Sequence, residues 1–68
     1  MCRNIKRLRR PEEQPTDAEL QAAALQFVRK ISGYRKPSKL NERAFEQAVL
    51  DIAACSRKLF DSLIFRGE

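Results

Sequence analysis

The sequence contains no histidine and no tryptophan, and only two cysteines among its 68 residues. Without histidine the chain cannot form a Ser-His-Asp or Cys-His catalytic site, and it cannot hold a His-ligated metal. Two cysteines by themselves build neither a zinc site nor a disulfide scaffold of the secreted kind. No apolar run reaches the roughly 18 residues of a membrane span, and no signal peptide opens the chain. We therefore expect no enzyme activity, no cofactor and no membrane insertion.

The formal net charge of +5 is concentrated in the first ten residues. Residues 1–10, the basic arm, hold five basic residues and no acid, whereas residues 11–68 hold nine of each sign. A second acid-free block of five basic residues lies within 29–39, and its members are Arg29, Lys30, Arg35, Lys36 and Lys39. The sequence therefore predicts two basic patches on a mildly acidic body.

The first predicted helix spans residues 17–32. Thr16 with Glu19 three residues later forms a capping-box pattern, and Gly33 supplies the stop. Its apolar positions are spaced 4, 3, 4 and predict a buried stripe of Leu20, Ala24, Phe27 and Ile31, with Ala23 and Val28 at the edges. Leu25 projects roughly opposite this stripe, either as a single exposed leucine or as part of a small second contact face.

The second predicted helix spans residues 42–64, with Asn41 as N-cap and Ser38 as the alternative start. Its stripe keeps helical period and consists of Phe45, Ala48, Val49, Ile52, Leu59, Phe60 and Leu63. Ser56 interrupts the stripe, and we expect its hydroxyl to bond to the carbonyl of Ile52. No window of the chain alternates like a strand.

These elements predict an all-α single domain: a basic arm and proline-containing linker over 1–15, then an antiparallel two-helix hairpin over 16–68. A lone hairpin of this size buries little apolar surface, so a further element must complete the core. Ile5 and Leu8 would let the basic arm dock across the helices. A second copy would instead form a four-helix bundle. We expect both, and hence a homodimer.

The basic residues suggest an anion-binding surface. In the loop, Arg35, Lys36, Ser38 and Lys39 precede the second helix, whose free N–H groups and dipole favour an anion. In the arm, the candidates are Arg3, Lys6 and Arg7, which could contact nucleic acid by counterion release. The alternative for the loop is a solvated turn. If the arm runs back along the hairpin, the two patches merge into one surface.

Cys2 is the candidate for a thiol-dependent function. Removal of Met1 would make it the terminus beside Arg3, and a neighbouring cation raises the thiolate fraction. Redox sensing, an N-terminal nucleophile and an intermolecular metal site follow from this, with a docked apolar side chain as the structural alternative. We expect Cys55 to be a buried structural thiol at the core edge.

The opening Met1-Cys2-Arg3-Asn4-Ile5-Lys6 and the block from Leu25 to Ser38 resemble a family of short bacterial proteins catalogued as a domain of unknown function. The resemblance covers nearly the whole chain, except that residues 9–14 lack the family's usual aromatic and Pro-Pro pair. It implies a small, cytoplasmic, helical bacterial protein and carries no activity with it. We therefore expect a non-enzymatic interaction or anion-binding module for nucleic acid, a phosphate ligand or an acidic protein, with a thiol function at Cys2 as the alternative.

Overall fold

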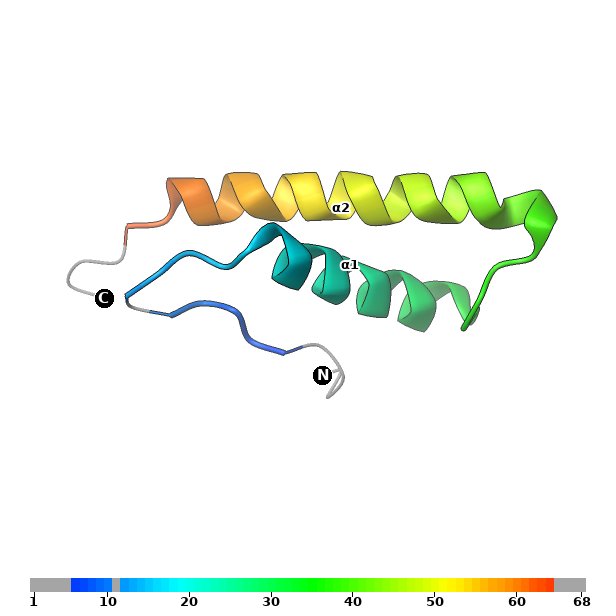
Figure 1. Cartoon of the computed structure of the whole chain (residues 1–68), viewed down its shortest axis with the longest axis horizontal. Coiled ribbons are helices and arrows are strands. Elements are labelled where there is room, and N and C mark those ends of the chain that lie inside the picture. Colours follow the sequence, from blue (N-terminus) through cyan, green and yellow to red (C-terminus); the bar gives the residue numbers. More distant parts are fainter. Residues whose placement is uncertain (1–5, 11, 65–68) are drawn as a thin grey trace.

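The computed structural model describes residues 6–10 and 12–64, and within them every regular element is a helix. Helix α1 spans Asp17–Ser32, a short 3₁₀ turn η1 spans Lys39–Asn41, and helix α2 spans Glu42–Ser62. The two long helices pack side by side in opposite directions, joined by the loop on which η1 lies (Figure 1). The predicted all-α antiparallel hairpin is therefore confirmed.

Helix α1 begins and ends at the residues that the sequence predicted, because local groups fix both ends. The Thr16 hydroxyl accepts a hydrogen bond from the Glu19 N–H at 3.1 Å, and the Glu19 carboxylate accepts one from the Thr16 N–H at 2.9 Å. At the other end Gly33 adopts φ 76°, and its N–H donates to the Arg29 carbonyl. A left-handed residue at this position closes the helix, and glycine adopts that conformation without strain.

Helix α2 begins at Glu42, as predicted, and ends at Ser62, two residues before the predicted end. No glycine or proline stops it there, and the Leu63 N–H makes the last helical bond, to the Leu59 carbonyl at 3.1 Å. Ser56 donates to the Ile52 carbonyl at 2.7 Å, which confirms the predicted back-bond. Within the described residues, neither helix is long and apolar enough to cross a membrane.

Fewer residues are buried than the two predicted stripes contain, and Leu59, predicted in the stripe of the second helix, is 54% exposed. Its buried apolar residues, among those the structure describes, are Leu20, Ala24, Val28 and Ala53. The α1 stripe was wrong in part: Phe27 and Ile31 are 41% and 65% exposed, while Val28, predicted at the edge, is 4% exposed. Because α2 contacts α1 along the i, i+4 row through Leu20, Ala24 and Val28, the residues on the neighbouring row stay outside the contact.

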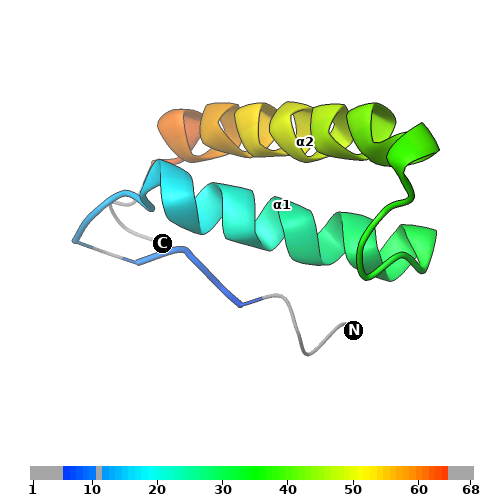
Figure 2. The same cartoon turned by 45° about the vertical axis from the view of Figure 1, so that its right-hand side comes forward.

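The linker and the arm close one end of the hairpin. Pro15 is fully buried, and its carbonyl accepts a hydrogen bond of 2.7 Å from Arg57 on α2. Gln14 donates to the Phe60 carbonyl at 3.2 Å. From this anchor the arm turns and runs back beside α1 (Figures 1 and 2). Leu8 packs against the core, as expected for a docked arm, whereas Ile5 lies outside the described residues.

Candidate anion-binding surface

The acid-free block of residues 29–39 forms the loop end of the hairpin, from the last turn of α1 to the start of η1. All five of its basic residues are exposed or half-exposed; they are Arg29, Lys30, Arg35, Lys36 and Lys39. The first acidic residue after the block is Glu42, at the start of α2. Like charges at this density repel one another and attract a counter-anion, so the loop end is the most cationic part of the described hairpin.

The path of the loop is fixed by a few hydrogen bonds. The Tyr34 N–H donates to the Ser32 hydroxyl at 3.1 Å, immediately after the Gly33 turn. The Arg29 Nε donates to the Arg35 carbonyl at 3.0 Å. That bond uses the Nε–H donor, and the guanidinium carries four further N–H donors on its two terminal Nη atoms. Arg29 therefore both holds the loop and contributes donors to the surface.

Two hydroxyl groups in this loop are oriented by one amide. Asn41 Nδ2 donates to the Tyr34 hydroxyl and to the Ser38 hydroxyl, both at 3.3 Å. A hydroxyl that accepts a hydrogen bond keeps its own proton for another acceptor. Tyr34 and Ser38 thus present O–H donors among the basic side chains. Ser38 was predicted as a site residue; Tyr34 and Asn41 were not, although an aromatic residue next to Arg35 was a signal for a binding loop.

A shallow hollow of about 230 Å³ lies at the C-terminal end of α1. Its lining residues contribute three cations, one phenol and one amide, and they are Gln26, Arg29, Lys30, Gly33, Tyr34 and Arg35. No acidic side chain is among these described lining residues. The hollow collects anion-binding donors at the end of α1, whereas the sequence placed the site at the start of α2.

The start of α2 offers fewer free N–H groups for an anion than the sequence predicted. Asn41 was predicted as a side-chain N-cap, but it makes no side-chain capping bond, and its amide goes to the loop hydroxyls instead. The 3₁₀ turn already pairs the N–H of Asn41 with the Ser38 carbonyl and the N–H of Glu42 with the Lys39 carbonyl. Those two N–H groups are therefore engaged within the turn, and the expected anion cradle of free N–H groups is correspondingly reduced.

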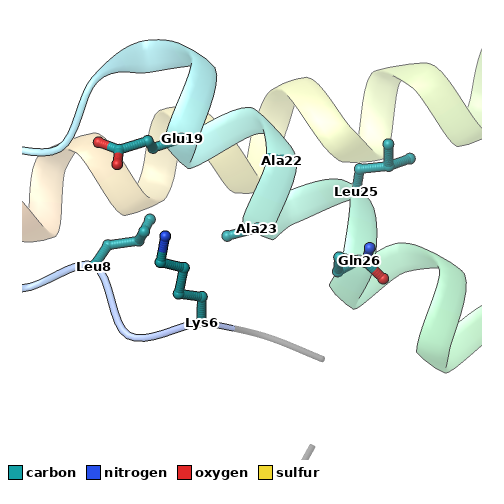
Figure 3. A pocket seen from close by; sticks show the side chains of 7 residues that line it. All are labelled: Lys6, Leu8, Glu19, Ala22, Ala23, Leu25 and Gln26. Carbon is teal, nitrogen blue, oxygen red and sulfur yellow. The ribbon is translucent and has the colours of Figure 1, made fainter. Parts of the chain in front are cut away.

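The arm brings a second group of cations toward the loop end. Lys6 and Leu8 extend from the arm toward α1 and, with α1 residues, line a cavity of about 310 Å³ (Figure 3). Gln26 lines this cavity and also the basic hollow at the loop end. Gln26 therefore separates the cavity beside the arm from the hollow at the loop end, and the described part of the arm runs beside α1 in the direction that would merge the two basic patches. Lys6 and Arg7 are exposed.

One arm cation has a structural role. Arg10 forms a two-pronged ion pair with Glu19, with distances of 2.8 and 3.1 Å, and also donates to the Gln14 carbonyl at 3.3 Å. The Thr16 N–H, followed by the Arg10 guanidinium, holds the pKa of Glu19 below its ordinary value. The hydrogen bond to Glu19 raises the pKa of Arg10 in turn. Arg10 fixes the arm to α1, whereas Lys6, Arg7 and Arg9 are exposed.

The predictions for the two cysteines have different outcomes. Cys2, like Arg3, lies outside the described residues, so the thiol hypothesis stays a prediction. Cys55 was predicted to be buried, and this was wrong, since it is exposed and carries a free thiol. It follows the buried Ala53 by two residues, which at about 100° per residue turns it about 160° away from the core. The described residues contain no group of three or more His, Cys, Asp or Glu side chains that could hold a metal.

The fold and this surface define a small, basic helical-hairpin protein. The family model described as "Uncharacterized conserved protein (DUF2277)" matches residues 1–68, and the chain belongs to that family. No curated protein and no solved structure is detectably similar to the chain.

Proposed function

We propose that this chain is a non-enzymatic anion-binding module whose loop end, extended by the arm, binds phosphate groups of a nucleic acid or of a smaller phosphate ligand. The observation that carries the proposal is the loop end itself. There, five basic residues with no acidic residue among them share one segment with the Tyr34 and Ser38 hydroxyls, which both accept hydrogen bonds from Asn41. An acidic protein is the alternative partner for the same charges.

The donor chemistry favours phosphate over a carboxylate partner. Guanidinium, ammonium and hydroxyl groups together are the side chains that most often contact phosphate oxygens. Arg29 and Arg35 offer fork-shaped donors, Lys30 offers a point charge, and the hydroxyls add neutral donors. The exposed ring of Tyr34, with 42% of its surface accessible, supplies one stacking face for a base.

Binding is tested with a fluorescein-labelled single-stranded oligonucleotide, with inorganic polyphosphate and a polyglutamate peptide as competitors, across a salt series. The test variant is Lys36→Ala/Lys39→Ala. Its affinity for the oligonucleotide is expected to fall about tenfold, and the dependence of log K on log salt to become shallower by about 2. Polyphosphate should compete better than polyglutamate.

The matched control is Gln21→Glu/Ala54→Glu, which lowers the net charge by the same amount at exposed positions near the other end of the hairpin. This control should retain most of the affinity. Equal losses in the two variants would show that net charge alone drives binding and would refute a site at the loop end. Preferred competition by polyglutamate would assign the surface to an acidic protein instead.

A further inference from the structure

Helix α2 carries two adjoining rows of small and apolar residues. The first row faces α1: Ala53 is buried there, and Val49 and Phe60 pack against the same core, which Ile52 also contacts from the edge of the next row. The second row lies beside it and consists of Phe45, Ala48, Ile52, Cys55 and Leu59. Its spacing of 3, 4, 3, 4 is that of a coiled-coil seam. A helix with two such seams contacts two neighbouring helices, and the described chain supplies one of them.

The second row is uncovered where it lies farthest from α1. Leu59 is 54% exposed and Cys55 is exposed, whereas Phe45, Ala48 and Ile52 are half-buried by their own hairpin. Exposed apolar side chains at regular helical spacing differ from isolated surface leucines, because they form a continuous strip. Within this row the exposed members are Cys55 and Leu59, in the C-terminal half of α2.

Residues of α1 extend this strip on the same side of the hairpin. Leu25 and Leu50 line a common cavity on one side, and Phe45 and Val49 form part of its wall. At about 100° per residue, Phe27 is about 160° from Leu25, and Leu59 is about 180° from Leu50. Phe27 and Leu59 therefore lie on the side away from that cavity. Ile31, one turn after Phe27 and 65% exposed, continues the apolar surface on this side.

We infer that this face binds a second copy of the chain, with the two α2 helices antiparallel and the two-fold axis between Ile52 and Cys55. In that register every layer joins a large residue to a small one. Ile52 meets the partner's Cys55, Leu59 meets the partner's Ala48, and Phe45 meets the partner's Ser62. Large side chains packed against small ones fill the space between helices without voids.

The flanking charges fit the same register. Asp51 and Lys58 lie along the outer edge of the second row, one heptad apart. In the antiparallel pairing Asp51 of one copy lies close to the partner's Lys58, and the symmetry makes this pair twice. A parallel pairing would instead place Asp51 and Lys58 of the two copies on opposite sides of the seam, where they form no such pair. Charge complementarity therefore supports an antiparallel second copy over other arrangements.

The size of the core is consistent with this partner. Four apolar residues are buried among those that the structure describes, and two of them are alanines. A domain below about 70–80 residues with so little buried apolar surface is commonly completed by oligomerisation. The inferred interface goes beyond the proposed anion-binding function, since the loop-end cations lie outside the second row.

The first experiment measures molar mass by sedimentation equilibrium over a concentration series. The wild-type chain should approach twice its 7.9 kDa mass at high concentration. Leu59→Glu, on the second row, should remain monomeric with unchanged helical circular dichroism, because this side chain is exposed in the single hairpin. Leu50→Glu is the matched control: the same change on the same helix, at 52% exposure on the opposite side, should still dimerise.

A wild-type chain that stays monomeric at millimolar concentration would refute the second copy. Dissociation by Leu50→Glu with Leu59→Glu unaffected would place the interface on the other face. The orientation is tested by exchanging charges. Asp51→Lys or Lys58→Asp alone should weaken association roughly fivefold, and the double exchange should restore it. Failure of the double exchange to restore association would exclude the antiparallel register.

Cys55 provides an independent readout, because it is exposed in one hairpin and covered in the inferred dimer. In a Cys2→Ser background, its alkylation by iodoacetamide should slow as protein concentration rises through the association range. The same reaction in Leu59→Glu should stay fast at every concentration. A concentration-independent rate in the parent chain would contradict the inferred interface.

Discussion

Glu19 is the residue on which the most interactions of the arm and linker converge. Its Oε1 accepts from the Thr16 N–H at 2.9 Å and from Arg10 at 2.8 Å, and its Oε2 accepts from Arg10 at 3.1 Å. The first contact belongs to the capping box that starts α1, and the others attach the arm to α1. One carboxylate thus serves both a local and a tertiary purpose.

This arrangement predicts a dependence of stability on pH. The pKa of Glu19 is lowered in the folded chain, first by the Thr16 N–H and then by Arg10. A carboxyl group with a lowered folded pKa contributes stability above its unfolded pKa of about 4.3, and this contribution is lost as the pH falls through the folded value. Glu19→Gln should therefore reduce the difference in melting temperature between pH 7 and pH 3.

Thermal unfolding followed by circular dichroism at the two pH values measures the effect. Glu46→Gln is the control, since Glu46 lies on the exposed surface of α2, away from the capping box and the arm. The interpretation fails if Glu19→Gln keeps the full pH dependence of the wild-type chain. It also fails if Glu46→Gln reduces that dependence equally.

The two roles of Glu19 differ in how far they could be predicted. Thr16 and Glu19 are three residues apart, so the capping box is visible as a short motif in the sequence. Arg10 lies nine residues before Glu19 across two prolines, and nothing local specifies that the chain turns back there. Contacts of that kind depend on the tertiary path of the linker, which residue spacing does not encode.

At the scale of the element, the end of α1 depends on one glycine. Gly33 has φ 76°, and an added Cβ would meet open space, so the cost of a side chain there is conformational rather than steric. Gly33→Ala should lower the free energy of unfolding by about 1 kcal/mol, and Gly33→Asn should lower it less, because asparagine tolerates the left-handed region better. Urea unfolding of both variants checks this order. An unchanged stability in Gly33→Ala would contradict the closing role.

The element boundaries were predictable where local chemistry fixes them, and the buried faces were less so. Periodicity identified an apolar side of each helix but not which of two adjoining rows contacts the other helix. On α1 the contact runs through Val28 rather than Phe27, and on α2 it leaves Leu59 and Cys55 outside. A rotation of less than one residue's angle decides between such rows, and packing against the neighbour sets it.

At the scale of the whole molecule, Arg57 joins the linker to α2. It donates to the Pro15 carbonyl at 2.7 Å and to the Asp17 carboxylate at 2.9 Å. Arg57→Met keeps much of the aliphatic stem but leaves the carbonyl of the buried Pro15 without its donor. The expected loss is about 1–2 kcal/mol of unfolding free energy, measured by urea denaturation.

Asp17→Asn separates the two bonds of Arg57. The Asp17 side chain is 87% exposed, so losing its ion pair should cost only about 0.5 kcal/mol. A larger loss in Asp17→Asn than in Arg57→Met would show that the ion pair, rather than the bond to Pro15, holds the linker. If both variants were as stable as the wild-type chain, Arg57 would not stabilise the attachment of the linker to α2.

The candidate site was predictable in composition and not in arrangement. The acid-free block predicted Arg35, Lys36 and Lys39 as members of one patch, and the structure places all three exposed on the short segment between the helices. The hydrogen bonds of Asn41 to the loop hydroxyls and the position of the arm beside α1 depend on how the loop and linker turn. Such turns follow from tertiary packing. The residue types of the site could therefore be predicted from the sequence, whereas their arrangement in space could not.

The shared carboxylate of Glu19 also makes the arm and the start of α1 thermodynamically linked. A polyanion that recruits Arg10 must compete with Glu19 and so withdraws a partner from the carboxylate of the capping box. A polyanion that uses Lys6 and Arg7 leaves the pair intact. Because such coupling is reciprocal, a change that stabilises the first turn of α1 weakens binding through Arg10. The same change leaves binding through Lys6 and Arg7 unaffected. Under the proposed function, Arg10 is therefore the arm cation coupled to the first turn of α1, and Lys6 and Arg7 are the arm cations whose binding to an anion would leave that turn undisturbed.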